Sequence, residues 1–190
     1  MVLLKNRNRN NVKRKISAEL FNVVKEQGEL LKYIQDELKT EELCLAAVQE
    51  NHWALYYVPE ALKTKEVCQT AVQKHGGMLL CDVPETLKSE ELCLTAVHNY
   101  NSAIRLVPQA VKNPEFCLDA VPNYGYLLQF IPEDQKTYEV CLAAVETDGK
   151  ALKYVPEALK NKELCLAALL ENYRAFEYVP DEFKTNDYLN

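Results

Sequence analysis

The chain has 190 residues, 48% of them hydrophobic, and a formal net charge of −6 at pH 7. No apolar run approaches the ~20 residues of a membrane-spanning helix, and the apolar part of the opening segment is too short for a secretory signal. These features argue against a membrane protein or membrane partner. We expect a cytoplasmic protein, or one in a host cytosol if a virus or bacterium delivers it.

Residues 1–15 are predicted to form a basic N-terminal arm that is flexible or bound to a partner. The arm contains six of the 22 basic residues and none of the 28 acidic ones, so residues 16–190 carry 16 basic and 28 acidic side chains, or −12. An acidic body with a basic arm favours partners of opposite charge. The basic residues of the arm are Lys5, Arg7, Arg9, Lys13, Arg14 and Lys15.

Residues 16–190 are predicted to form a single domain of repeats of about 24 residues. A degenerate first repeat covers 16–37, and a partial last repeat covers 183–190. A fixed period of 20–50 residues is typical of a solenoid, in which each repeat buries its apolar face against its neighbours. The full repeats begin near Leu38, Leu62, Leu87, Val111, Gln135 and Leu159. A cysteine marks the same register in each of them: Cys44, Cys68, Cys93, Cys117, Cys141 and Cys165.

Each repeat opens with a lysine and an N-cap residue, followed by a first helix. In the repeat from Leu38, Lys39 and Thr40 precede an apolar stripe that includes Cys44 and Ala47, which predicts one buried helix face. Equivalent positions in stacked helices lie roughly 8–10 Å apart, whereas a disulfide needs Cα atoms closer than about 7 Å. We therefore expect the cysteines in register to be buried thiols, with Cys81, which is outside the register, more exposed.

A second, short helix and a single turn complete the repeat. Ala54, Leu55 and Val58 supply the apolar side of this helix, and Pro59 ends it near Tyr57. Residues 59–62 then form one turn that begins at the proline. In other copies a glycine near the end of the first helix is interpreted as a breaker, at Gly76, Gly125 and Gly149. The pattern predicts an all-α protein, an α-solenoid of short helix–turn–helix repeats.

The repeat pattern V-P-E-x-L-K-[TN]-x-E-x-C-L-x-A-V-x-x-N-x-x-A-L-x-Y resembles a known tandem repeat family. That family is catalogued as domain of unknown function four-one-one-six, and its arrays occur in bacterial, viral and protist proteins. The resemblance covers nearly the whole chain and implies stacked helical repeats. It implies no catalytic residues, because the family has no established chemistry.

The sequence contains no recognisable arrangement of catalytic or metal-binding residues. Its three histidines, His52, His75 and His98, fall at different places in the repeat, so a shared cluster is not expected. No phosphate-binding glycine motif and no nucleophile elbow occurs. We expect no enzymatic activity, no cofactor and no metal site.

Positions that differ between copies are the candidates for a recognition surface, because packing determines the others. The aromatic and arginine residues among and beside them are of the kind enriched at interface hot spots. Partial burial over the groove between helices is the alternative role for these side chains. The candidate partner-binding residues are Trp53, Tyr56, Tyr100, Arg105, Tyr124, Tyr126, Tyr173 and Arg174. Variable positions on the same edge also include Met78, Ser102, Gln129, Lys150, Lys153 and Glu177.

The sequence thus favours a non-enzymatic protein–protein interaction module. Its acidic body predicts a basic macromolecular partner, such as a nucleic-acid-handling complex. The protein would inhibit that complex, as an anti-defence protein might. The alternative function is direct nucleic-acid binding through the basic arm and the repeated lysines, which would line one edge as phosphate contacts. Those lysines could instead cover the apolar surface of the adjacent turn with their aliphatic stems.

Overall fold

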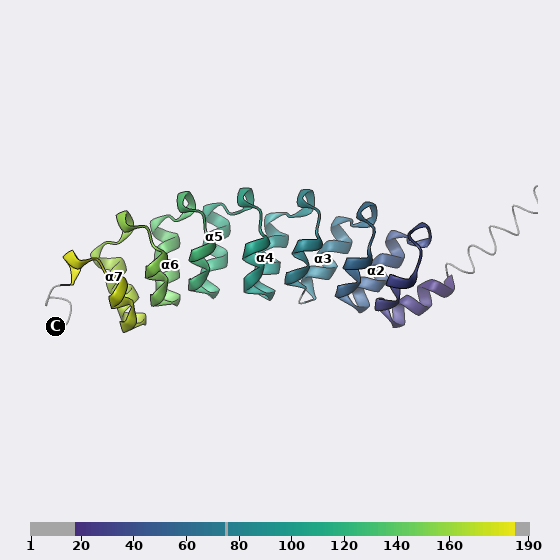
Figure 1. Ribbon diagram of the computed structural model, residues 1–190, viewed down its shortest axis with the longest axis horizontal. Helices are drawn as coiled ribbons and strands as arrows, with labels where there is room; N and C mark the ends of the chain where they lie inside the picture. The colour runs from purple at the N-terminus through teal and green to yellow at the C-terminus, as the bar shows by residue number, and fades with distance from the viewer. Residues whose placement is uncertain (1–17, 75, 185–190) are drawn as a thin grey trace, which may run out of the picture. The chain divides into compact units, whose positions relative to one another are not determined.

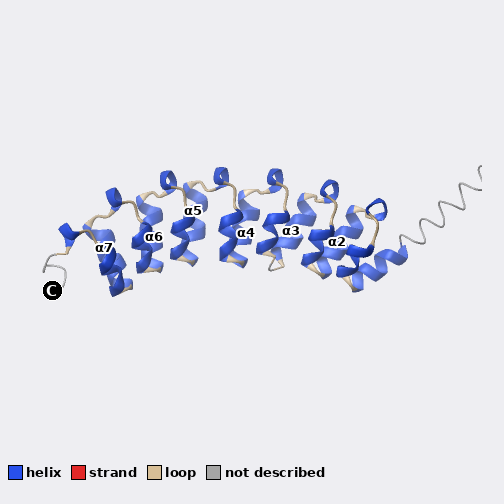
Figure 2. Ribbon diagram, viewed as in Figure 1, coloured by secondary structure: helices blue, strands red, loops and turns tan. Residues whose placement is uncertain are grey.

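The computed structural model describes residues 18–74 and 76–184. The described residues form α-helices and 3-10 helices, and none of them lies in a strand (Figure 2). The predicted all-α repeat fold is therefore confirmed. The basic arm, His75 and the part of the last repeat after Lys184 lie outside the described residues, so what was predicted for them stays a prediction. The chain divides into two compact units, with the boundary between Lys88 and Ser89.

Unit 1 contains three repeats, in which η denotes a 3-10 helix. Residues 18–26 are helical and precede η1 (Gly28–Tyr33) and η2 (Asp36–Leu38). The next repeat comprises α2 (Glu41–Glu50), η3 (His52–Tyr57) and η4 (Glu60–Leu62). The third comprises α3 (Lys65–Gln73), η5 (Gly77–Asp82) and η6 (Glu85–Leu87). The α2 helix packs against α3, η1 and η3, and α2 and α3 lie side by side (Figure 1).

Unit 2 contains four repeats with the same order of elements. The first two comprise α4 (Glu90–Asn99), η7 (Asn101–Leu106), η8 (Gln109–Val111), α5 (Pro114–Ala120), η9 (Val121–Asn123), η10 (Gly125–Phe130) and η11 (Glu133–Gln135). The last two comprise α6 (Tyr138–Thr147), η12 (Gly149–Tyr154), η13 (Glu157–Leu159), α7 (Lys162–Glu171), η14 (Tyr173–Tyr178) and η15 (Asp181–Phe183). Helices α4 to α7 pack in sequence, and η7, η10, η12 and η14 contact one another in the same order. Each unit is thus an α-solenoid stack (Figure 1).

The second helix of each repeat is a 3-10 helix, which the sequence pattern did not distinguish from a short α-helix. In η3 the backbone N–H of Ala54 donates to the carbonyl of Asn51, and the N–H of Val58 donates to the carbonyl of Leu55, both i to i−3 bonds. The proline two residues after the helix prevents its extension. Since 3-10 helices are stable only as short segments, six residues followed by Val-Pro suit this form. The predicted end at Tyr57 is confirmed.

The predicted N-caps are confirmed in every repeat where the structure describes one. The side-chain oxygen of the cap residue accepts a hydrogen bond from the backbone N–H three residues later, at 2.8–3.4 Å. Such a bond satisfies one of the unpaired amides in the first turn of the helix. The caps are Thr40, Thr64, Ser89, Asn113, Thr137 and Asn161.

The core is a seam of cysteine, alanine and branched aliphatic side chains. All six cysteines in register are buried free thiols, and Cys81 is an exposed one, as predicted. In α6, Val140, Cys141, Ala144 and Val145 are all fully buried. A side chain as small as alanine lets neighbouring helices approach closely, so the periodic residues of the sequence form the surface on which the repeats stack.

Glycine has a different role from the predicted helix breaker. Helix α6 ends at Asp148, which has extended backbone angles and whose N–H still donates to the carbonyl of Ala144. Gly149 comes one residue after this end, as the first residue of η12, and Gly125, the first residue of η10, follows Tyr124 at the end of η9. A Cβ atom at Gly149 would lie 2.2 Å from the carbonyl oxygen of Ala168 in the next α-helix. The glycine therefore serves close packing between repeats and not a left-handed turn.

Glycine at the first position of a six-residue 3-10 helix coincides with a ten-residue α-helix next in the same unit. Gly28, Gly125 and Gly149 precede the ten-residue helices α2, α6 and α7, and a Cβ at each would meet the carbonyl of the alanine in register. His52 and Asn101 occupy the same place before α3 and α5, which have nine and seven residues. A residue with a side chain at the first position of the 3-10 helix is thus found where the next α-helix is shorter than ten residues.

Gly149→Ala is expected to destabilise unit 2 by about 2 kcal/mol, since the new methyl group would displace a backbone carbonyl. The neighbouring exposed change Lys150→Ala is the control, with an expected effect within about 0.5 kcal/mol. Urea unfolding followed by circular dichroism measures both. Equal stabilities of the two variants would contradict the close-packing role of Gly149.

Candidate interaction face on the 3-10 helices

The six-residue 3-10 helices divide their side chains between core and solvent in the same way in both units. Their third and fourth residues point inward, as Ala151 and Leu152 do in η12, where both are fully buried. The exceptions are Leu30 in η1, which is half-buried, and Phe176 in η14, which is 43% exposed. Side chains at i and i+3 of a 3-10 helix lie on the same side, so the second and fifth residues share an outer edge. We call these second and fifth residues the variable face of each unit, because they differ between repeats.

The variable face contains residues that sequence reasoning identified and three that it missed. The fifth residue is exposed in every described repeat: Lys32, Tyr56 and Cys81 in unit 1, and Arg105, Gln129, Lys153 and Glu177 in unit 2. The second residues are Glu29, Trp53 and Met78 in unit 1, and Ser102, Tyr126, Lys150 and Arg174 in unit 2. Sequence reasoning missed Glu29, Lys32 and Cys81. They could have been identified from the repeat register, because each is the second or fifth residue of the second helix in its repeat.

In unit 1 the structure places Trp53 and Tyr56 together on η3. Trp53 is 53% exposed and Tyr56 is 69% exposed. The Trp53 ring lies 5.4 Å from that of His52, and the Tyr56 ring meets Tyr57 edge-on at 5.3 Å. Both candidates are therefore held on neighbouring rings with much of their apolar surface open to solvent.

In unit 2 the structure brings Tyr100, Arg105, Tyr124 and Tyr126 together where η7 meets η10. The Tyr124 and Tyr126 rings are 6.2 Å apart, and the Arg105 guanidinium lies 4.7 Å from the centre of the Phe130 ring. Partial burial raises the pKa of Tyr126; the nearby Tyr124 and Tyr100 add to this shift, and Arg105 opposes it. Four candidates from two successive repeats thus form one cluster.

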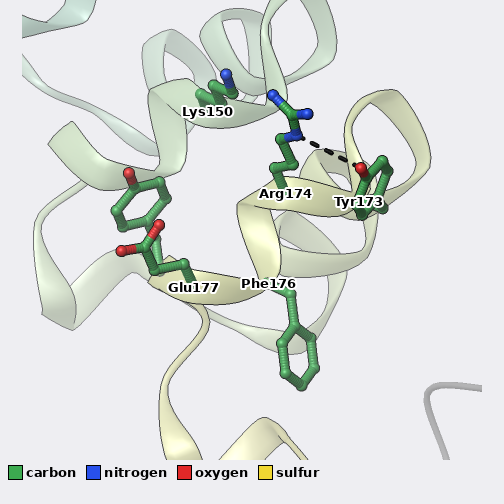
Figure 3. A pocket seen from close by; sticks show the side chains of 6 residues that line it. Lys150, Tyr173, Arg174, Phe176 and Glu177 are labelled. Atoms are coloured by element: carbon green, nitrogen blue, oxygen red, sulfur yellow. Dashed lines mark hydrogen bonds between the residues drawn. The ribbon is translucent and has the colours of Figure 1, made fainter.

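The last two candidates border a hollow between η12 and η14 (Figure 3). The hollow has a volume of about 480 Å³ and is lined by Lys150, Tyr173, Arg174, Phe176, Glu177 and Tyr178. The Nε of Arg174 donates to the hydroxyl of Tyr173 at 3.4 Å. Figure 3 shows the charged ends of Lys150 and Arg174 on the same side of the hollow. An acidic group placed there would meet both cations.

The charges of unit 2 are separated between its two kinds of helix. Its variable face carries four basic side chains, Arg105, Lys150, Lys153 and Arg174, and one acidic side chain, Glu177, for a net +3. Helices α4 to α7 contain one lysine and eight acidic residues, for a net −7. The acidity that the composition shows therefore lies on the α-helices, and the variable face of this unit is basic.

The repeated lysines do not form an exposed edge in the described chain. Their side chains are largely buried, with 6% of the Lys136 side chain exposed. The Nζ of Lys136 donates to the backbone carbonyl of Tyr154 at 2.9 Å and pairs with the carboxylate of Glu133. Each of four lysines thereby caps the end of the following six-residue 3-10 helix, where a cation is favourable: Lys39, Lys112, Lys136 and Lys160. Of the two roles predicted for these lysines, the structure supports the buried one.

Lys112 is the exception within this series, because glutamine replaces the acidic partner at Gln109. Its Nζ donates to the carbonyl of Phe130 at 3.1 Å, but no carboxylate within 4.0 Å is described for it. Burial lowers the pKa of Lys112 below its usual value of 10.5. One repeat of unit 2 thus holds a desolvated cation without the ion pair of its neighbours.

Gln109→Glu is expected to supply the missing carboxylate and to stabilise unit 2 by about 0.5–1 kcal/mol at pH 7. The substitution should also raise the pKa of Lys112, since a negative charge favours the protonated amine. Urea unfolding at pH 7 measures the gain. Glu133→Gln, which removes the equivalent partner of Lys136, is the matched control and should lose a similar amount. No gain from Gln109→Glu at low salt would contradict the role of the ion pair.

Within 18–74 and 76–184, no helix is both long enough and apolar enough to cross a membrane. The same residues contain no group of three or more histidine, cysteine, aspartate or glutamate side chains placed to hold a metal ion.

Comparison with protein families finds a match to a model described as a domain of unknown function, DUF4116. The model matches residues 20–63, 113–160 and 137–184, which together exceed half of the chain. The chain belongs to the DUF4116 family. The three matches lie across the repeats of both units, so the DUF4116 unit corresponds to successive copies of the α-helix, 3-10 helix and proline turn described above. Neither the curated proteins nor the solved structures gave a match to this chain.

Proposed function

We propose that this DUF4116 protein is a non-enzymatic interaction module that binds another protein through the variable face. One observation carries the proposal: the cysteine and alanine that recur in register are buried, whereas the residues of the variable face differ between repeats and, apart from the half-buried Ser102 and Tyr126, are exposed. A repeat scaffold with constant packing and variable exposed positions can alter its recognition without altering its fold.

The side chains on and beside this face support a protein partner. Trp53, Tyr56 and Tyr173 each expose more than half of their surface, and large aromatic side chains that become desolvated on binding are the usual hot spots of protein interfaces. Arg105 and Arg174 lie beside aromatic rings. Such a surface combines apolar anchors with directional hydrogen-bond donors.

The net negative charge of the protein predicts a basic partner, and the separation of charge between the two kinds of helix determines which surface such a partner would contact. A basic protein would contact the acidic α-helices, and blocking the basic surface of a nucleic-acid-handling complex would then be the inhibitory form of this function. We place the main contact on the variable face, because the acidic residues in the first turns recur with the repeat and also suit the helix dipole. Direct nucleic-acid binding is an outcome of the test below.

Selection of a random peptide display library on the immobilised full chain tests the proposal. Selected clones should bind at least about tenfold more weakly to a face variant with the changes Trp53→Ala, Tyr56→Ala, Tyr126→Ala and Arg174→Ala. They should bind normally to a control variant with alanine at exposed α-helical positions: Gln49→Ala, His98→Ala, Glu146→Ala and Leu170→Ala.

Two outcomes would overturn the proposal. In the first, the clones would bind both variants equally, which would place recognition elsewhere. In the second, the library would yield no binder while a single-stranded oligonucleotide bound with an affinity that falls steeply as salt rises. That result would favour nucleic-acid binding.

A further inference from the structure

The variable face of unit 2 presents four cations for which the described residues supply no carboxylate partner. None of Arg105, Lys150, Lys153 and Arg174 forms a described ion pair within 4.0 Å, whereas the buried lysines at 39, 63, 88, 136 and 160 all do. We propose that this stretch of the face binds an extended, acidic peptide segment of the partner protein. The inference rests on the proposed function and adds the chemistry and spacing of the ligand.

Aromatic rings hold three of the four cations in place. The Arg105 guanidinium lies 4.7 Å from the centre of the Phe130 ring, the Lys153 amine 5.7 Å from that of Tyr154, and the Arg174 guanidinium 5.9 Å from that of Tyr173. A side chain restrained in this way loses less conformational entropy on binding. A guanidinium over a ring also keeps N–H donors at its edge, where a carboxylate can accept two hydrogen bonds.

The stacking of repeats sets the spacing of acidic residues in the ligand. Consecutive 3-10 helices of unit 2 contact one another, and packed helices lie roughly 8–10 Å apart. An extended chain rises about 3.3 Å per residue, so about three ligand residues cover one repeat. Arg105 belongs to η7, the two lysines to η12 and Arg174 to η14. The ligand should therefore carry acidic residues about six and then about three positions apart.

The repeat between these cations offers a different contact. There η10 presents Tyr126 and Gln129 on the variable face, with Tyr124 beside them. The hydroxyl and amide groups can hydrogen-bond the peptide backbone, and the rings can cover an apolar ligand side chain. The middle of the ligand is accordingly expected to be uncharged.

A peptide suits this surface better than a nucleic acid does. Residues 89–184 contain 15 acidic and nine basic side chains, so the unit as a whole carries −6. The α-helices, with their net −7, pack directly against the 3-10 helices, and exposed charges interact over about 8 Å at physiological salt. A continuous phosphate backbone would be repelled by these charges and by Glu177. A short segment with three carboxylates meets mainly the local cations.

The test uses the full chain and a fluorescein-labelled peptide of about twelve residues on a glycine–serine background. Its three glutamates stand about six and then about three positions apart. We expect a Kd on the order of 100 µM in low salt that weakens as salt is added. The comparison peptide has the same composition with its glutamates adjacent, and it should bind at least about threefold more weakly.

Two matched variants locate the binding. The face variant replaces four exposed cations by glutamine, at Arg105, Lys150, Lys153 and Arg174, and should weaken peptide binding about tenfold or more. The control variant removes four exposed lysines from the α-helices and their ends by the same change, at Lys25, Lys65, Lys74 and Lys162, and should bind as the unaltered protein does. Circular dichroism confirms that both variants fold.

The outcomes separate this inference from the proposed function. Equal loss in both variants, or equal binding of the two peptides, would overturn the acidic-peptide ligand. Tighter binding of a single-stranded oligonucleotide to the same face would also overturn it and favour nucleic acid. If the display library yields clones that depend on the variable face but carry no acidic residues, this inference fails while the proposed function stands.

Discussion

Val145→Asp is expected to unfold unit 2 at 25 °C or to lower its free energy of unfolding by more than about 4 kcal/mol. Val145 is fully buried on α6, which packs between α5 and α7. An aspartate there must either lose its hydration as a charged group or take up a proton, and both cost free energy. Because domains of this size are stable by only about 5–15 kcal/mol, one such change removes much of the margin.

The same kind of substitution one repeat later provides the control. Leu170 lies near the end of α7, where the equivalent residue in α6 is Glu146, and it is 88% exposed. Leu170→Asp should therefore alter stability by no more than about 0.5 kcal/mol. Urea unfolding by circular dichroism at 222 nm compares the two variants. Similar effects would mean that the assignment of the buried seam is wrong.

Stability is also expected to fall steeply as the pH rises from 9 to 11. Burial raises the pKa of four thiols to about 11 from the usual 9.0: Cys44, Cys68, Cys117 and Cys141. Between these values the unfolded chain has already lost the thiol protons that the folded chain retains, so rising pH favours the unfolded state. Below pH 9 the contribution is fully present. Each unit contains two such cysteines, so both units lose stability in this range.

Cysteine variants attribute the alkaline loss to these groups. Cys141→Ala should flatten the dependence of the unfolding free energy on pH between 9 and 11, because it removes one buried thiol. Cys81→Ala removes the exposed thiol and should leave most of the loss in place. Urea unfolding at several pH values, with a reducing agent present, measures the slopes. Identical slopes in the unaltered protein and Cys141→Ala would contradict the explanation.

The N-caps, the cysteine–alanine seam and the end of the second helix could be predicted because they depend on local or periodic information. Thr40 accepts a bond from the amide only three residues away, and a proline stops a helix within the same few residues. Cys141 and Ala144 recur at a spacing that places them on one helix face. The eight candidate partner-binding residues were chosen from variation between copies, which is visible in the chain itself, and their binding role stays a prediction.

The grouping of those candidates was not predictable from their positions. Tyr100 and Arg105 precede Tyr124 and Tyr126 by one repeat, and only the packing of η7 against η10 brings the two pairs together. The form of the second helix matters as well, because a 3-10 helix aligns its second and fifth residues on one edge. The basic character of this edge in unit 2 was hidden by a net charge that sums both kinds of helix.

What the amino-acid sequence determined by itself is the repeat: its period, its capped helices, its proline turns and the apolar seam on which neighbours stack. Only the tertiary structure decided what the remaining polar residues do. Lys136 reaches the carbonyl of Tyr154 at the end of the following 3-10 helix, and Gly149 lies against the carbonyl of Ala168 in the next α-helix. The physical reason is the distance along the chain over which each kind of contact acts. Caps and turns act over three or four residues, whereas these contacts join elements about 18 residues apart that meet only once the repeats have packed.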